Sequence, residues 1–124
     1  MILDSGAVIA FTRGDIKVAA MIRSAHQRGD EIAVSPVVVA ETIRGGREDA
    51  SVHRLLNAVR VTFVGLRLGR LAGELLGGSQ MSSATDALVM AEAVRSGNAI
   101  LLTSDPNDMR RLARDRPSVV IVPV

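Results

Sequence analysis

The stretch ATDALVMAEAVRSGNAILLTSD, residues 84–105, decides the fold class, because it joins one apolar helix directly to one apolar strand. Helical periodicity begins near Ala84, and Gly97 is placed to end the helix. The run AILL, residues 99–102, follows at once and has no polar position that would give it a solvent-facing side. This pattern predicts a helix over 84–97 and a strand that is buried on both faces.

Strands and helices alternate outward from this stretch in both directions. We expect strands at residues 1–3, 31–34, 61–64, 99–102 and 119–122. We expect helices at residues 7–11, 16–27, 36–45, 48–59, 66–76, 84–97 and 109–114, a loop at 77–83 and a turn and helix start at 105–108. Such alternation with apolar strands is typical of a parallel sheet between two layers of helices, so we predict one α/β domain over residues 1–124.

The composition excludes several kinds of site. The chain has no Cys, Trp or Tyr, which excludes thiolate chemistry and leaves almost no aromatic platform for stacking bases. No apolar run approaches the length of a membrane span, and Asp4 interrupts the opening apolar residues before a signal peptide could form. We therefore expect a cytoplasmic protein that makes no use of a membrane.

Charge is distributed in a way that favours an anionic partner. The formal net charge is +2, from 15 basic and 13 acidic residues. If five of the 13 acids lie in one metal site, eight remain against 15 basic residues on the rest of the surface, which would suit a phosphate backbone. Arginines cluster just after the turn at 105–108, at Arg110, Arg111, Arg114 and Arg116. We expect the first three to contact RNA phosphates, and a solvated basic helix is the alternative interpretation.

Two acidic residues follow predicted strands and two lie on predicted helices. Asp4 follows the first strand and Asp105 follows the strand at 99–102, at the edge where parallel α/β sheets bind ligands. Asp86 is the more telling of the two helical acids, because its neighbours on the same helix face are Val89, Met90 and Ala93. The polar face of that helix is predicted to carry Glu92, Arg95 and Ser96.

Glu41 is the fourth acid and lies among Val and Ala in the predicted helix 36–45. A carboxylate on an apolar face is costly unless a cation joins it. Mg²⁺ or Mn²⁺ would lower that cost, because these ions prefer carboxylate oxygens and leave positions open for substrate phosphates. The ordinary alternative is an ion pair between Glu41 and Arg44.

The other acids have ordinary structural interpretations too. Asp4 would cap the following helix, and Asp86 would face the dipole of its own helix. Asp105 and Asp108 are typical of turns and helix starts. Only the four acids taken together favour a metal site.

Three segments resemble PIN domains, especially the VapC toxins of bacterial toxin–antitoxin pairs: MILDSGAVIA (1–10), VVVAETIRGG (37–46) and ATDALVMAEAVRSGNAILLTSDPNDMRRL (84–112). The resemblance implies that Asp4, Glu41, Asp86 and Asp105 are the catalytic and metal-binding acids and that Asp108 is an additional metal-site acid. It implies that the Thr103 hydroxyl orients a carboxylate, and that the five-stranded sheet has the order 3-2-1-4-5. One departure is the absence of an aromatic residue after Asp108, where Met109 stands.

The resemblance also implies an activity and partners. We expect an Mg²⁺- or Mn²⁺-dependent endoribonuclease that leaves 5′-phosphate and 3′-hydroxyl ends, forms a homodimer and is inhibited by a cognate antitoxin. The alternative is a catalytically silent PIN-like module that binds RNA or protein. A phosphatase of the DxD type is disfavoured, because Gly6 stands where that motif requires a second acid.

Overall fold

A parallel five-stranded sheet forms the centre of the protein in the computed structural model, which describes residues 1–114 and 116–124. The strand order is β3-β2-β1-β4-β5, as the resemblance implied, and every neighbouring pair is parallel. The strands are β1 (Ile2–Leu3), β2 (Ala33–Val34), β3 (Arg60–Val61), β4 (Ala99–Thr103) and β5 (Val119–Pro123). The first strand therefore lies in the middle, between strands from distant parts of the chain.

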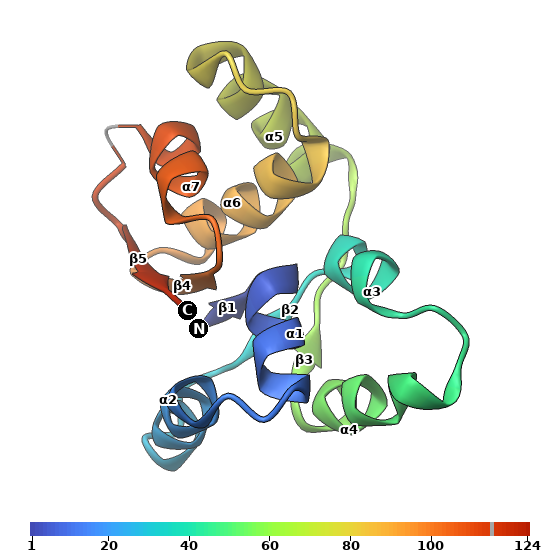
Figure 1. The fold of residues 1–124 in the computed structure, drawn as a ribbon. Coiled ribbons are helices and arrows are strands. Elements are labelled where there is room, and N and C mark those ends of the chain that lie inside the picture. The colour runs from blue at the N-terminus through green and yellow to red at the C-terminus, as the bar shows by residue number, and fades with distance from the viewer. Residues whose placement is uncertain (115) are drawn as a thin grey trace.

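Helices cover both faces of the sheet, so the predicted α/β class is confirmed (Figure 1). One layer, blue to green in the figure, contains α1 (Ser5–Thr12), α2 (Ile16–Gln27), α3 (Pro36–Thr42) and α4 (Ala50–Ala58), with a 3-10 turn at Arg47–Asp49. The other layer contains α5 (Leu66–Ser79), α6 (Ala84–Ser96) and α7 (Pro106–Ala113), which contact one another. Helix α3 touches both α1 and α6, and so connects the two layers.

The strand register brings the carboxyl ends of the central strands into line. Leu3 of β1 is paired with Val34 on one side and with Leu102 on the other. The ladder continues past β1, because the Asp4 amide donates to the Leu102 carbonyl at 3.1 Å. Residues just after Leu3 and Leu102 are therefore neighbours, although about a hundred positions separate them in the sequence.

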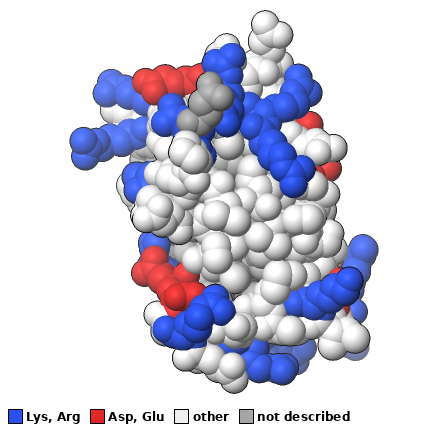
Figure 2. Space-filling view, turned by 90° about the vertical axis from the view of Figure 1, so that its left-hand side faces the viewer, with Lys and Arg blue, Asp and Glu red and all other residues white. Residues whose placement is uncertain are grey.

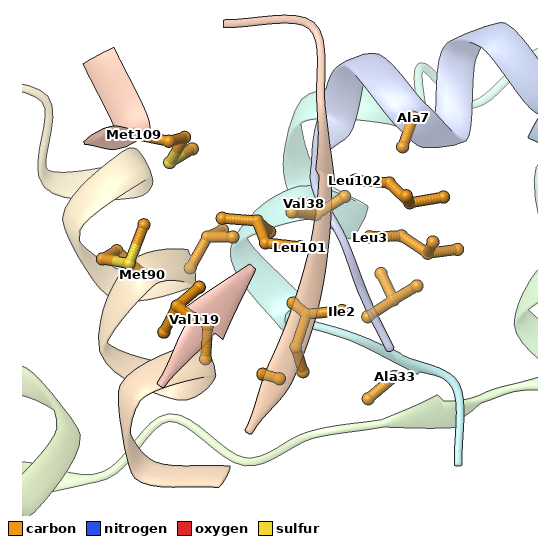
Figure 3. Packing of buried hydrophobic residues seen from close by; sticks show 14 of the residues in the cluster. Ile2, Leu3, Ala7, Ala33, Val38, Met90, Leu101, Leu102, Met109 and Val119 are labelled. Atoms are coloured by element: carbon orange, nitrogen blue, oxygen red, sulfur yellow. The ribbon is translucent and has the colours of Figure 1, made fainter. Parts of the chain in front are cut away.

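The core is aliphatic, as the composition requires. Leu3, Leu101 and Leu102 are fully buried in the two central strands. Figure 3 shows Met90 and Met109 on one side of the sheet and Ala7 of α1 on the other. In the described ranges, no helix has the length and apolar character that a membrane crossing would need.

Several predicted boundaries were wrong. The strand predicted at 61–64 is Arg60–Val61: the Thr62 amide makes the last bond to β2, which ends at Val34, and Phe63 is 78% exposed. Helix α3 stops at Thr42, because the amides of Arg44 and Gly45 bond to the Asp49 carboxylate instead.

Two other helices are longer than predicted. Helix α5 runs through both glycines of the predicted loop at 77–83 to Ser79, and ends at Gln80 with a left-handed φ of 59°. Helix α1 begins at Ser5, earlier than the predicted residue 7, whereas α7 begins at Pro106, within the predicted turn and helix start at 105–108. These shifts change lengths but no connection of the fold.

Candidate functional site

Five acidic side chains come from the carboxyl edge of the sheet and the helices that lie over it. Asp4 follows β1 directly, and Asp105 follows β4 after one further residue. Asp86 and Asp108 lie in the first turns of α6 and α7, and Glu41 lies in α3, which contacts α1 and α6. The fold therefore gathers at one edge the acids that the sequence distributes over most of its length.

Asp4 is the most enclosed of the five, with 5% of its surface exposed. One carboxylate oxygen accepts a hydrogen bond of 2.7 Å from the amide of Ala7, so Asp4 caps α1 as its ordinary interpretation predicted. Burial raises the pKa of Asp4, although interactions with the Thr103 hydroxyl and the amides of Ala7 and Ser104 act in the opposite direction. The negative charge of Asp86 raises this pKa further.

The pKa of Asp86 is affected by more of the other acids than the pKa of Asp4 is. Burial raises its pKa most, the Ser83 hydroxyl lowers it, and the charges of Glu41, Asp105 and Asp108 raise it further. Ser83 caps α6 by accepting from the Asp86 amide at 3.3 Å. Asp86 thus interacts electrostatically with each of the other four acids.

Thr103 connects the two acids at the strand ends. Its side chain is fully buried, and its hydroxyl oxygen accepts a hydrogen bond of 2.9 Å from the amide of Asp105. The same hydroxyl interacts with the Asp4 carboxylate and lowers its pKa. One hydroxyl group therefore ties the backbone at Asp105 to the side chain of Asp4.

Gly6 allows a close approach that helps to shape this edge. A Cβ atom at this position would lie 2.1 Å from the Ser104 Oγ and 3.1 Å from the Ser104 backbone nitrogen. Only glycine lets the start of α1 lie against the segment between β4 and α7. The segment that carries Asp105 is thereby held beside Asp4.

None of the five acids is neutralised by a basic side chain in the part of the chain that the structure describes. The ion pairs found there join Arg28 to Asp30 and Arg60 to Glu31. The predicted alternative for Glu41 was wrong, because the Arg44 guanidinium donates to the carbonyls of Ala40 and Ile43. Among residues 1–114 and 116–124, the repulsion between the acids therefore has no counter-charge from a paired basic side chain.

The donor chemistry fits a hard divalent cation, but the side chains are spread apart. Within residues 1–114 and 116–124, no group of three or more His, Asp or Glu side chains lies close enough to hold a metal ion. Asp105 is exposed, and Glu41 and Asp86 are partly exposed, so these carboxylates are free to rotate without disturbing the core. The five carboxylates supply the oxygen ligands that Mg²⁺ and Mn²⁺ prefer.

Glu92 was wrongly assigned to the polar face of its helix. It is only 2% exposed, the Thr62 hydroxyl donates to its Oε1, and Oε2 has no hydrogen-bond partner among the described residues. Burial raises the pKa of Glu92, and Thr62, Arg95 and Arg60 lower it by smaller amounts. The signal in the sequence was the run of apolar and small residues on both sides of Glu92, which indicates a helix covered nearly all round.

The three predicted RNA-binding arginines, Arg110, Arg111 and Arg114, lie exposed along α7 and at its end. They point to a cleft beside the last turn of α5 rather than pairing with the acids. Asp105 and Asp108 lie at the opposite end of α7.

Comparisons with known proteins agree with this fold. Residues 1–115 match the PIN domain family. Among solved structures, VapBC2 from Rickettsia felis bound to a DNA fragment from its promoter superposes with a TM-score of 0.79 at 16% identity, over 99% of this chain and 97% of that chain. A toxin–antitoxin complex from Klebsiella pneumoniae gives 0.76 at 16% identity, over 96% and 94%. At this identity the likeness shows the fold, and no curated protein matches the sequence.

Proposed function

Because this chain belongs to the PIN domain family, we propose that it is a metal-dependent endoribonuclease and the toxin of a toxin–antitoxin pair. The observation that carries the proposal is the convergence of five acids on one edge of the sheet, with Asp86 under the repulsion of the other four. Carboxylates gathered without a basic partner are typical of a site that a cation completes.

We assign the metal to Asp4, Glu41, Asp86 and Asp105, with Asp108 as an additional acid. The chemistry supplied by a bound Mg²⁺ or Mn²⁺ ion is polarisation of the scissile phosphodiester and neutralisation of charge on the leaving oxygen. Glu41 is partly exposed and Asp105 is exposed, so both carboxylates would be accessible to the ion.

The protein's own contribution is to hold the acids in place. The Ala7 amide fixes the Asp4 carboxylate at the start of α1, and Thr103 joins Asp4 to the backbone at Asp105. The Ser83 cap fixes the turn of α6 that carries Asp86. Groups held in this way need little reorganisation when the substrate phosphate arrives.

The substrate and partners in the proposal rest on the resemblance. We propose RNA as the substrate, 5′-phosphate and 3′-hydroxyl ends as the products, a homodimer as the assembly and a cognate antitoxin as the inhibitor. Both solved structures named above are complexes of a toxin with an antitoxin, and the shared fold supports the same kind of partner here.

The direct test is to incubate the purified chain with total RNA in Mg²⁺, in Mn²⁺ and in EDTA. We expect cleavage only with metal, and a loss of about 10²-fold or more in Asp4→Asn and in Asp86→Asn. The matched control is Asp30→Asn, which makes the same change at an exposed residue outside the acid group and should cleave as the wild type does.

Two results would contradict the proposal. Cleavage that persists in EDTA or in both acid variants would indicate a contaminating nuclease. RNA that is retained but never cut, with no metal-dependent rise in Tm, would support the catalytically silent module instead. Ligation of an adaptor to the 5′ ends of the fragments would test the predicted 5′-phosphate.

A further inference from the structure

A shallow cleft of about 650 Å³ lies between the last turn of α5 and helix α7. Its lining consists of polar residues and one glycine: Gly78, Ser79, Gln80, Arg110, Arg111 and Arg114. Figure 2 shows Lys and Arg side chains at both ends of this side of the molecule, one group of them at the upper end, which α5 and α7 occupy in Figure 1. We call these six residues the arginine cleft.

Gly78 makes room for one of the arginines. A Cβ atom at Gly78 would lie 2.7 Å from Nη1 of Arg114, so the guanidinium lies directly over the helix backbone. A Cβ atom at the neighbouring Gly77 would meet nothing within 4 Å. The missing side chain at Gly78 therefore admits Arg114 into the cleft.

The backbone is strained on both sides of the arginine cleft. Residues with positive φ other than glycine are few in the described ranges, and two of them line this cleft: Gln80 at 59° and Arg114 at 48°. Gln80 ends α5, a position that glycine usually fills. Strained residues persist where the surrounding structure holds them, and they cluster at functional sites.

The arginine cleft and the acid group share helix α7. Helix α7 begins directly after Asp105, carries Asp108 in its first turn and has eight residues, so it spans about 12 Å. On the other side, the short segment after Gln80 leads to Ser83 and Asp86. A nucleic acid strand that runs along α7 from the acids would therefore reach the arginine cleft.

We propose that the arginine cleft is a subsite for RNA backbone phosphates that flank the scissile bond. This inference rests on the proposed ribonuclease function and names the residues that would position its substrate. Guanidinium groups suit phosphate oxygens because they donate in a planar, bidentate arrangement. A protein partner is a poorer fit, since the lining has no aromatic or aliphatic side chain to serve as a buried anchor.

The first experiment measures binding separately from cleavage. In an Asp4→Asn background that leaves RNA intact, the affinity for a fluorescein-labelled single-stranded RNA of mixed sequence is measured across a range of salt concentrations. Each of Arg110→Gln, Arg111→Gln and Arg114→Gln should lower the slope of log K against log [salt] by about 0.7. Arg67→Gln, exposed in the first turn of the same α5 helix, is the control and should keep the slope.

The second experiment uses the two adjacent glycines of α5. Gly78→Ala should displace the Arg114 guanidinium and weaken RNA binding, whereas Gly77→Ala should leave binding unchanged. Neither variant should lower the Tm, because alanine is the better helix former and the atom displaced by Gly78→Ala is the end of a flexible side chain. A loss of affinity without a loss of stability distinguishes the subsite from a structural role.

The outcomes separate this inference from the proposed function. If the wild type cuts RNA and all four cleft variants bind RNA with the wild-type slope, the subsite is wrong and the ribonuclease stands. If the wild type cuts no RNA but the cleft variants bind RNA with a reduced slope of log K against log [salt], the proposed ribonuclease is wrong. The arginine cleft then remains a phosphate-binding site with no role in cleavage. If the cleft variants bind RNA as the wild type does but lose affinity for the protein encoded by a neighbouring reading frame, the cleft binds a protein. The proposed RNA subsite is then wrong.

Discussion

Thr103 shows how one buried hydroxyl can connect acids that follow different strands. Its oxygen accepts from the Asp105 amide while the group also interacts with Asp4. Because Thr103 is fully buried, water has no access to replace this hydroxyl. We therefore regard Thr103 as a positioning residue for both strand-end acids.

Thr103→Val should weaken the response to metal while the fold is retained. Valine fills a similar volume but leaves the Asp105 amide without its acceptor, and loss of such outer partners typically costs about 10- to 100-fold in metal affinity or activity. The measurement is the Mg²⁺ concentration that gives half-maximal RNA cleavage. Thr103→Ser keeps the hydroxyl and should restore the wild-type value; equal metal dependence in the valine variant would remove the positioning role.

Glu92 makes stability depend on pH. Burial raises the pKa of Glu92 above its ordinary value of 4.5, so the folded protein binds this proton more tightly than the unfolded chain. Its stabilising contribution is present below the unfolded pKa and is lost as pH rises through the folded pKa. Glu92 should therefore destabilise the protein at neutral pH.

Glu92→Gln should raise the Tm at about pH 8 and have little effect at about pH 4, where the wild-type side chain is already neutral. Glutamine keeps an acceptor for the Thr62 hydroxyl and carries no charge. Thermal unfolding across this range checks the prediction, with the exposed Glu74→Gln as the control. A Tm difference that does not vary with pH would indicate packing and not ionisation.

At the scale of elements, the start of α1 and the segment after β4 form one unit around Gly6. Gly6→Ala would place a methyl group against Ser104, at its backbone as well as its side chain. We expect a destabilisation of about 1–3 kcal/mol and reduced cleavage, because the segment that carries Asp105 must move. Gly73→Ala in α5, where a Cβ meets open space, is the control and should not destabilise.

A compensating change makes this prediction sharper. Ser104→Gly removes the two side-chain atoms that the new methyl group would meet but leaves the backbone nitrogen, so the double variant should recover part of the stability that Gly6→Ala loses. Chemical denaturation of the two single variants and the double variant gives the coupling energy between the positions. Additive effects would show that Gly6 and Ser104 do not constrain each other.

The elements also show what the sequence could and could not predict. The strand order and the helical layers followed from alternation and resemblance, because apolar strands with no polar face must be buried on both sides. Boundaries failed where tertiary contacts outweighed local signals: α5 runs through two glycines, and β3 is limited by the short β2 beside it. Glu92 was misplaced because helix periodicity assumes one solvent face, and α6 is buried along most of its length.

The position of the acid group could be predicted from the sequence, but the spacing and the interactions of its carboxylates could not. Strand ends in a parallel sheet placed Asp4 and Asp105 together, and apolar neighbours marked Asp86 as unusual. Their mutual repulsion and the spacing between the carboxylates depend on the contact of α3 with α6, which no local pattern encodes.

For the molecule as a whole, metal binding should stabilise the folded state. A ligand that binds only the native protein adds about 2.7 kcal/mol at 100 times its Kd. We expect Mg²⁺ or Mn²⁺ to raise the Tm of the wild type and to have a much smaller effect on Asp86→Asn. In metal-free buffer that variant should melt higher than the wild type, because it removes the charge that the other acids repel; equal Tm values with and without metal would oppose the assigned site.

The central position of β1 has a consequence for when activity can arise during synthesis. The side of β1 that pairs with Leu101 stays unpaired until β4 has been synthesised. Until then Asp4 also lacks its interaction with the Thr103 hydroxyl. A ribosome that has made only the first ninety residues has produced three of the five acids and no β4 to align them. Such long-range pairings form late, so a nascent or prematurely ended chain would lack the assembled acid group on which the proposed activity depends.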